Sequence, residues 1–117
     1  RFPVVLRRHL PEGHLVAVAL PADAELAADA VSELLPEERA HAAGLAPARR
    51  LAWVGGRVAL RAALADAGLT AGPIASTARG APALPAGVLG SVSHKRTVAV
   101  ALAAAGDAGD TAIGVDV

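Results

Sequence analysis

Alternating apolar positions predict three strands in the last third of this 117-residue chain. Between residues 97 and 104, branched apolar side chains alternate with alanines, which is the period-two pattern of a half-buried strand. The flanking blocks Gly90–His94 and 113–117 are also strand-like, and they place His94 and Asp116 at or near strand ends. If the three strands form an antiparallel meander, the first and third run in the same direction, which brings His94 and Asp116 to one edge of the sheet.

The first third of the chain predicts one strand and one helix. The apolar run His14–Leu20 is typical of a strand, and Pro21 ends it. Residues 22–34 place their apolar side chains on one helical face and their acidic side chains in the opening turns. Residues 1–12 show neither period, and we expect them to be irregular.

The middle of the chain predicts two helices. A short helix begins at Pro36, which two acidic residues follow, and it ends around Gly44. The longest helix should run from about Pro47 to Ala67, because apolar residues recur there at helical spacing. The glycine pair 55–56 in its middle costs about 1 kcal/mol per residue relative to alanine. This pair therefore predicts the close approach of another backbone or of a ligand.

Composition indicates one domain with a modest core. Hydrophobic residues make up 54% of the chain, but Phe2 and Trp53 are the only Phe, Trp or Tyr residues, so we expect close packing of small side chains. The chain lacks cysteine, which excludes disulfides and thiolate metal sites. Neither a membrane span nor a signal peptide is predicted, so we expect a cytoplasmic protein. Because the chain also lacks methionine, we expect it to be part of a longer protein.

The net charge of zero hides a strong asymmetry along the chain. Residues 1–38 carry a net charge of −4, residues 39–96 carry +7, and residues 97–117 carry −3. A basic middle segment predicts an anionic ligand. Nucleic acid is disfavoured, because stacking aromatics are almost absent and there is one lysine. Arginine-rich composition fits a compact, phosphate-rich cofactor better, since the guanidinium fork matches phosphate oxygens.

Three arginines of the long predicted helix share one face. Arg50, Arg57 and Arg61 lie at i, i+7 and i+11, within a narrow stripe, and Arg49 lies one residue aside. The stripe is either a solvated basic face or a surface for an anion. Since three like charges in one stripe repel each other, the anionic partner is favoured.

Two blocks of the sequence together resemble a known family. The blocks are Gly90-Ser91-Val92-Ser93-His94 and Ile113-Gly114-Val115-Asp116, preceded by Gly80-Ala81-Pro82. In this order they resemble the 4′-phosphopantetheinyl transferases of the larger, monomeric, two-lobed type. The resemblance implies an α+β fold, with helices packed on a small, mostly antiparallel sheet. It also implies that residues 1–117 are the N-terminal lobe of a pseudo-twofold enzyme whose C-terminal lobe is absent from this chain.

The family's reaction transfers 4′-phosphopantetheine from coenzyme A to a serine of an acyl or peptidyl carrier protein, with Mg²⁺, and releases adenosine 3′,5′-bisphosphate. The resemblance implies a metal-ligand role for Asp116 and a coenzyme A-binding role for five other residues. These are Arg49, Arg57, Arg79, Ser93 and His94. Arg79 lies at the start of a Pro/Gly-rich loop at 78–87, which follows a possible short strand at 74–77. The general base is expected in the absent lobe, so no catalytic residue is assigned here.

Two other interpretations compete with the transferase. A Ser–His–Asp hydrolase is discarded, because Ser93 and His94 are neighbours on a strand and point to opposite faces. The chain also lacks a Gly-x-Ser-x-Gly turn. A non-catalytic anion-binding or protein-interaction domain stays open, since it keeps the arginine stripe and gives His94 and Asp116 no joint role.

Overall fold

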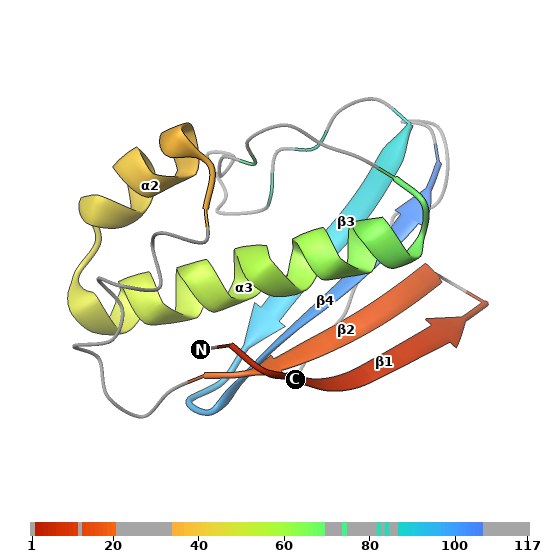
Figure 1. Ribbon diagram of the computed structural model, residues 1–117, viewed down its shortest axis with the longest axis horizontal. Helices are drawn as coiled ribbons and strands as arrows, with labels where there is room; N and C mark the ends of the chain where they lie inside the picture. The colour runs from red at the N-terminus through yellow and green to blue at the C-terminus, as the bar shows by residue number, and fades with distance from the viewer. Residues whose placement is uncertain are drawn as a thin grey trace.

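A four-stranded antiparallel sheet carries one long helix across a face in the computed structural model (Figure 1). The structure describes residues 2–11, 13–20, 34–69, 74, 82, 84 and 87–106. The sheet order is β1-β2-β4-β3. The elements are β1 (Val4–Leu10), β2 (Gly13–Ala19), α2 (Pro36–Ala43), α3 (Pro47–Asp66), β3 (Val88–His94) and β4 (Val98–Ala105). The predicted α+β architecture, with helices on a small antiparallel sheet, is confirmed.

Both described helices form where the sequence predicts them. Helix α2 begins at Pro36 and is followed by Gly44, and α3 begins at Pro47 and ends at Asp66, just before the turn at Gly68. Proline at the first position suits a helix start, since its missing N–H would have no intrahelical partner. Among the described helices, none is both long enough and apolar enough to cross a membrane. The predicted helix at 22–34 lies almost entirely outside the described residues, as do residues 75–77 of the possible short strand.

The expectation of irregular structure at residues 1–12 is wrong, because Val4–Leu10 forms strand β1. Its residues are mostly exposed, and it is held by antiparallel pairing to β2 rather than by a buried face. The register also shifts between Val4 and Leu6, which is typical of a β-bulge and breaks the alternation of side chains. An edge strand of this kind leaves no period-two hydrophobic pattern in the sequence.

The three-strand meander is also wrong, because both edges of β4 are occupied. Strand β3 pairs with one edge of β4, and β2 pairs with the other from His14↔Ala103 to Ala19↔Val98. Strand β2, far away in the sequence, therefore takes the place that the meander gave to residues 113–117. Those residues lie outside the described part of the chain, and Asp116 is among them.

Small residues form the contact between the sheet and α3. Ala99, Ala101 and Ala103 of β4 are fully buried in the core, together with Val16 and Val18 of β2. The branched residues of β4 alternate with these alanines and so point to the opposite face of the sheet. The prediction that small side chains permit close helix–sheet packing is confirmed.

The glycine pair of α3 lies where the helix comes closest to its neighbours. A Cβ atom at Gly55 would overlap Leu20 Cδ2 and lie 3.2 Å from Phe2 Cε1. A Cβ atom at Gly56 would lie 2.7 Å from Val92 Cγ1. The expected close approach is therefore present. It is made by side chains of the chain itself rather than by a backbone or a ligand.

We predict that Gly55→Ala lowers the free energy of unfolding by about 1 kcal/mol. Overpacking a filled core costs about 1–3 kcal/mol, and better helix propensity returns about 1 kcal/mol. Urea unfolding at unchanged m-value measures the difference. Gly44→Ala is the matched control, because Gly44 has φ −82° and meets only His41 O, at 3.6 Å. It should change stability by less than about 0.5 kcal/mol. A Gly55→Ala variant as stable as wild type would contradict the packing argument.

Candidate functional site

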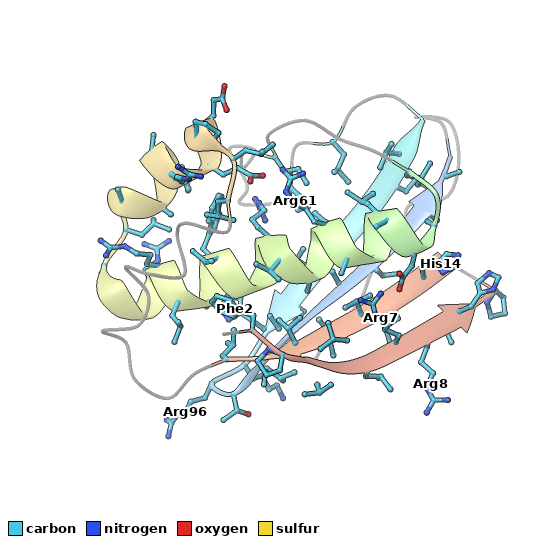
Figure 2. All side chains as sticks on the ribbon, in the orientation of Figure 1. Phe2, Arg7, Arg8, His14, Arg61 and Arg96 are labelled. Atoms are coloured by element: carbon cyan, nitrogen blue, oxygen red, sulfur yellow. The ribbon has the colours of Figure 1, made fainter. Side chains whose placement is uncertain are left out.

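The end of β3 carries an exposed histidine beside two exposed cations. His94 is the last residue of β3, and Lys95 and Arg96 follow it in the turn to β4. The turn is closed by Lys95 N, which donates to Val98 O at 2.9 Å. Figure 2 shows Arg96 extending outward from this hairpin. Lys95 and Arg96 are thus turn residues at the surface, as the sequence predicted, and they add positive potential near His94.

The packing of β3 under α3 shows toward which end of the helix His94 lies. Gly90 of β3 faces Leu60 of α3, and Val92, two residues further, faces Gly56. Strand and helix therefore run in opposite directions. Continuing the same alternation brings His94 toward the N-terminal half of α3. Arg49 is exposed and lies in the first turn of α3, in the same half of the helix.

Ser93 lies on the face of β3 opposite to His94, because the strand remains extended through both residues. Ser93 pairs with Val100 and His94 pairs with Ala99 across the ladder to β4. Strand β3 is at an edge of the described sheet. An anion lying against that edge can meet side chains from both faces, whereas an anion lying on either face cannot.

The arginine stripe of α3 is engaged within the protein. Arg50 donates to three main-chain oxygens at the end of α2: its Nε to Ala42 O at 3.0 Å, and its Nη2 to Ala43 O at 3.1 Å and Leu45 O at 3.0 Å. It therefore caps the negative end of that helix. This arginine holds α2 against the start of α3.

Arg57 is buried, with 3% of its surface exposed. Its Nε donates to Ile74 O at 3.0 Å, and its guanidinium carbon lies 4.5 Å from the centre of the Trp53 ring. Burial lowers the pKa of Arg57 to about 10, nearby Glu38 opposes that shift, and Arg61 adds to it. Since this pKa is well above 7, the side chain stays cationic at neutral pH.

Arg61 has an anionic partner, and that partner belongs to the same chain. Arg61 Nη2 donates to Glu38 Oε2 at 2.7 Å, and the Glu38 side chain is 1% exposed. Figure 2 shows Arg61 directed from α3 toward α2. The repulsion expected among the three arginines is therefore relieved by a carboxylate, an indole ring and main-chain oxygens.

Glu38 is the notable residue of this region that sequence reasoning missed. The sequence suggested an acidic residue at a helix start, and Glu38 does occupy the N3 position of α2 with Oε1 accepting from Leu35 N at 3.1 Å. A Glu three residues after the N-cap is a recognisable local signal. Its other partners, Arg61 and Ile74, lie 23 and 36 residues away, and no local pattern indicates them.

The structure brings together only part of the predicted site. His94 and Arg49 lie toward the same end of α3. Arg57, in the middle of α3, is buried. Arg79 and Asp116 lie outside the described residues. Within the described part of the chain, no group of three or more His, Cys, Asp or Glu side chains could hold a metal ion.

Comparison with known proteins identifies the family. The model of the 4′-phosphopantetheinyl transferase N-terminal domain matches residues 37–104, which include most of α2, all of α3 and β3, and nearly all of β4. The chain is 44% identical over 89 residues to the 4′-phosphopantetheinyl transferase Svp of Streptomyces mobaraensis. That alignment covers 75% of this chain and 35% of the relative, so the chain spans about a third of the relative's length. The chain therefore belongs to the 4′-phosphopantetheinyl transferase family.

Proposed function

We propose that residues 1–117 are the N-terminal lobe of a two-lobed enzyme that transfers 4′-phosphopantetheine from coenzyme A to a serine of an acyl or peptidyl carrier protein. The observation that carries this proposal is the family match over residues 37–104, which includes the exposed His94 at the end of β3. A cytoplasmic location and a C-terminal lobe supplied by further sequence are parts of the same proposal.

In the proposed reaction, the serine oxygen attacks the β-phosphorus of coenzyme A. The bond from that phosphorus to the bridging oxygen breaks, and adenosine 3′,5′-bisphosphate leaves. The serine proton passes to a base, which we place in the C-terminal lobe. Phosphoryl transfer depends mainly on positioning and charge stabilisation, so this lobe's contribution is to hold the phosphates.

Exposed donors near the end of β3 suit this binding role. We assign His94 and Ser93 to phosphate oxygens, with the nucleotide lying along the edge of β3 where both side chains can reach it. Arg49 and Arg79 are assigned to the 3′-phosphate and pyrophosphate region. A phosphate contact by Arg57 would have to use its terminal nitrogens, because Nε is bound to Ile74 O.

The described acidic residues do not fit a magnesium site. Two of the three, Glu38 and Asp66, are paired with Arg61 and Arg7, and a paired carboxylate is a poor candidate for a metal ligand. The third, Glu37, is exposed on α2 and belongs to no group of three possible metal ligands among the described residues. We therefore assign the chain's metal carboxylate to Asp116, on the strength of its motif. When bound, Mg²⁺ would offset charge on the pyrophosphate, and it commonly takes one or two carboxylates with phosphate oxygens and water.

The alternative of a non-catalytic anion-binding domain is weakened, because the three arginines of the stripe contact groups of the chain itself. That alternative rested on a basic helix face turned toward a ligand. Arg50, Arg57 and Arg61 instead contact main-chain oxygens, Trp53 and Glu38. Lys95 and Arg96 are exposed in the β3–β4 turn beside His94, which fits a site at the end of β3 better than a site along α3.

We predict that His94→Ala in the full-length protein weakens coenzyme A binding by about 1.5–3 kcal/mol, the range for a hydrogen bond to a charged group. Calorimetric titration with coenzyme A measures the loss, and the melting temperature should stay close to that of wild type. His9→Ala is the matched control, because His9 is an exposed histidine on β1, at the opposite edge of the sheet. Unchanged affinity in His94→Ala would remove His94 from the site.

We also predict that residues 1–117 alone show no measurable transfer, since half of a site that works by positioning supplies almost none of the rate. Adding the C-terminal part, in cis or as a separate chain, should restore transfer, and chelation of Mg²⁺ should abolish it. The assay is incubation of apo carrier protein with coenzyme A, followed by intact mass measurement. Modification of the carrier protein by the isolated lobe, or none by the reassembled protein, would refute the proposal.

A further inference from the structure

Two histidines face each other across the β1–β2 hairpin. His9 of β1 and His14 of β2 are direct partners in the antiparallel register, so their side chains leave the sheet on the same face. Their ring centres are 4.2 Å apart, and their ring planes differ by 5°. Figure 2 shows His14 near the end of the hairpin. His9 is exposed and His14 is half-buried, so solvent reaches the pair.

The chemistry of this pair goes beyond ring stacking. Because the pair is open to solvent, stacking removes little apolar surface from water. A neutral imidazole also carries one nitrogen with a free lone pair, and this nitrogen is the commonest metal ligand in proteins. The hairpin therefore brings two such nitrogens, one from each strand, within a few ångströms of each other.

The spacing of the rings suits chelation of a divalent transition metal. Zn–N bonds are about 2.0–2.1 Å long, so two imidazole nitrogens on one zinc ion lie about 3 Å apart. Rings with centres 4.2 Å apart reach that separation by a small rotation about the outer side-chain torsion. This torsion has a broad energy well, so the rotation costs little. The main chain need not move.

The sheet holds the main chain of both histidines in place. Strand β2 pairs with β1 along one edge and with β4 along the other, where His14 lies opposite Ala103. Gly13, just before His14, has φ +152°, and a Cβ atom there would lie 2.4 Å from Ala103 O. The start of β2 is therefore packed tightly against β4, which fixes the Cα position of His14.

The charges around the pair do not oppose a bound cation. Arg7 lies two residues before His9 on the same face of β1, but its guanidinium is ion-paired with Asp66 at the end of α3. Arg8 lies on the opposite face of the strand. The Arg7–Asp66 pair also ties β1 to α3 close to His9, so this edge strand is anchored where the site requires it.

We propose that His9 and His14 form a binding site for a divalent transition metal such as Zn²⁺, whose binding cross-links β1 to β2. Within the described ranges, no third His, Cys, Asp or Glu side chain completes a group around a metal. Water therefore fills the remaining positions, and the metal is exchangeable. Imidazole suits Zn²⁺, Ni²⁺ and Cu²⁺, whereas Mg²⁺ prefers oxygen ligands. This inference does not rest on the proposed function.

The test is calorimetric titration of the untagged full-length protein with ZnCl₂, in a buffer that contains millimolar Mg²⁺ to fill oxygen-ligand sites. His9→Ala and His14→Gln should each lose this zinc site or fill it at least about tenfold more weakly, since even changes beside a metal ligand cost about 10–100-fold in affinity. His41→Ala is the matched control, because His41 is an exposed histidine on α2. It should bind Zn²⁺ as wild type does.

Amide hydrogen exchange locates the bound metal. In wild type, Zn²⁺ should slow exchange several-fold at the amides of β1 and β2 near the hairpin end, because cross-linked strands separate less often. The same amides should not respond to Zn²⁺ in His9→Ala. The β3–β4 hairpin is the internal control, because it carries His94 without a histidine opposite to it, and its amides should keep their exchange rates.

The outcomes decide the proposal directly. Weaker binding in both histidine variants, together with protection confined to the β1–β2 hairpin, supports the site. A Zn²⁺ affinity of His9→Ala equal to that of wild type overturns it. Protection that spreads equally over both hairpins overturns it as well, because a general stabilisation of the fold would then account for the effect.

Discussion

The closeness of α3 to the sheet is the constraint on which the rest of this structure depends. Gly55 and Gly56 carry no Cβ atom where Leu20 and Val92 lie against the helix, and the buried residues of β4 at 99, 101 and 103 are alanines, so the helix and the sheet come close together. Interiors of this density have little space to absorb an added methyl group. The position of β3 beneath α3, and with it the place where His94 reaches the surface, is therefore determined by the size of small residues.

Charge along the sequence and charge at the surface differ in this protein. The basic middle segment suggested a face for an external anion, but its arginines are largely matched inside the chain. Glu38 neutralises Arg61, Ile74 O and the Trp53 ring contact Arg57, and main-chain oxygens accept from Arg50. The exposed cations near the end of β3 are fewer and are gathered at one turn. A local concentration of this kind can attract an anion even when the net charge of the chain is zero.

The sequence predicted the features that depend on local physics. The bounds of α2 and α3 follow from proline and glycine at their ends, and β2 and β4 follow from apolar residues that one face of the sheet buries. Strand β1 could not be predicted in this way, because pairing at an edge leaves no hydrophobic period. The pairing of β2 with β4 could not be predicted either, because the local sequence of a strand does not indicate which distant strand it pairs with. The position of His94 at the end of a strand was predictable, whereas the burial of Glu38 depends on contacts made 23 and 36 residues away.

The single tryptophan of the chain occupies an informative place. One face of Trp53 meets the guanidinium of Arg57, and its ring centre lies 4.7 Å from that of His41 on α2. Indole emission responds to nearby charge and to the polarity of its surroundings. The intrinsic tryptophan fluorescence of these 117 residues therefore arises at the junction between α2 and α3, beside the contacts that Glu38 and Arg57 make with Ile74. Any event that moves α2 relative to α3 should therefore change the emission of Trp53. The change can be measured without a label, because these 117 residues contain no second tryptophan.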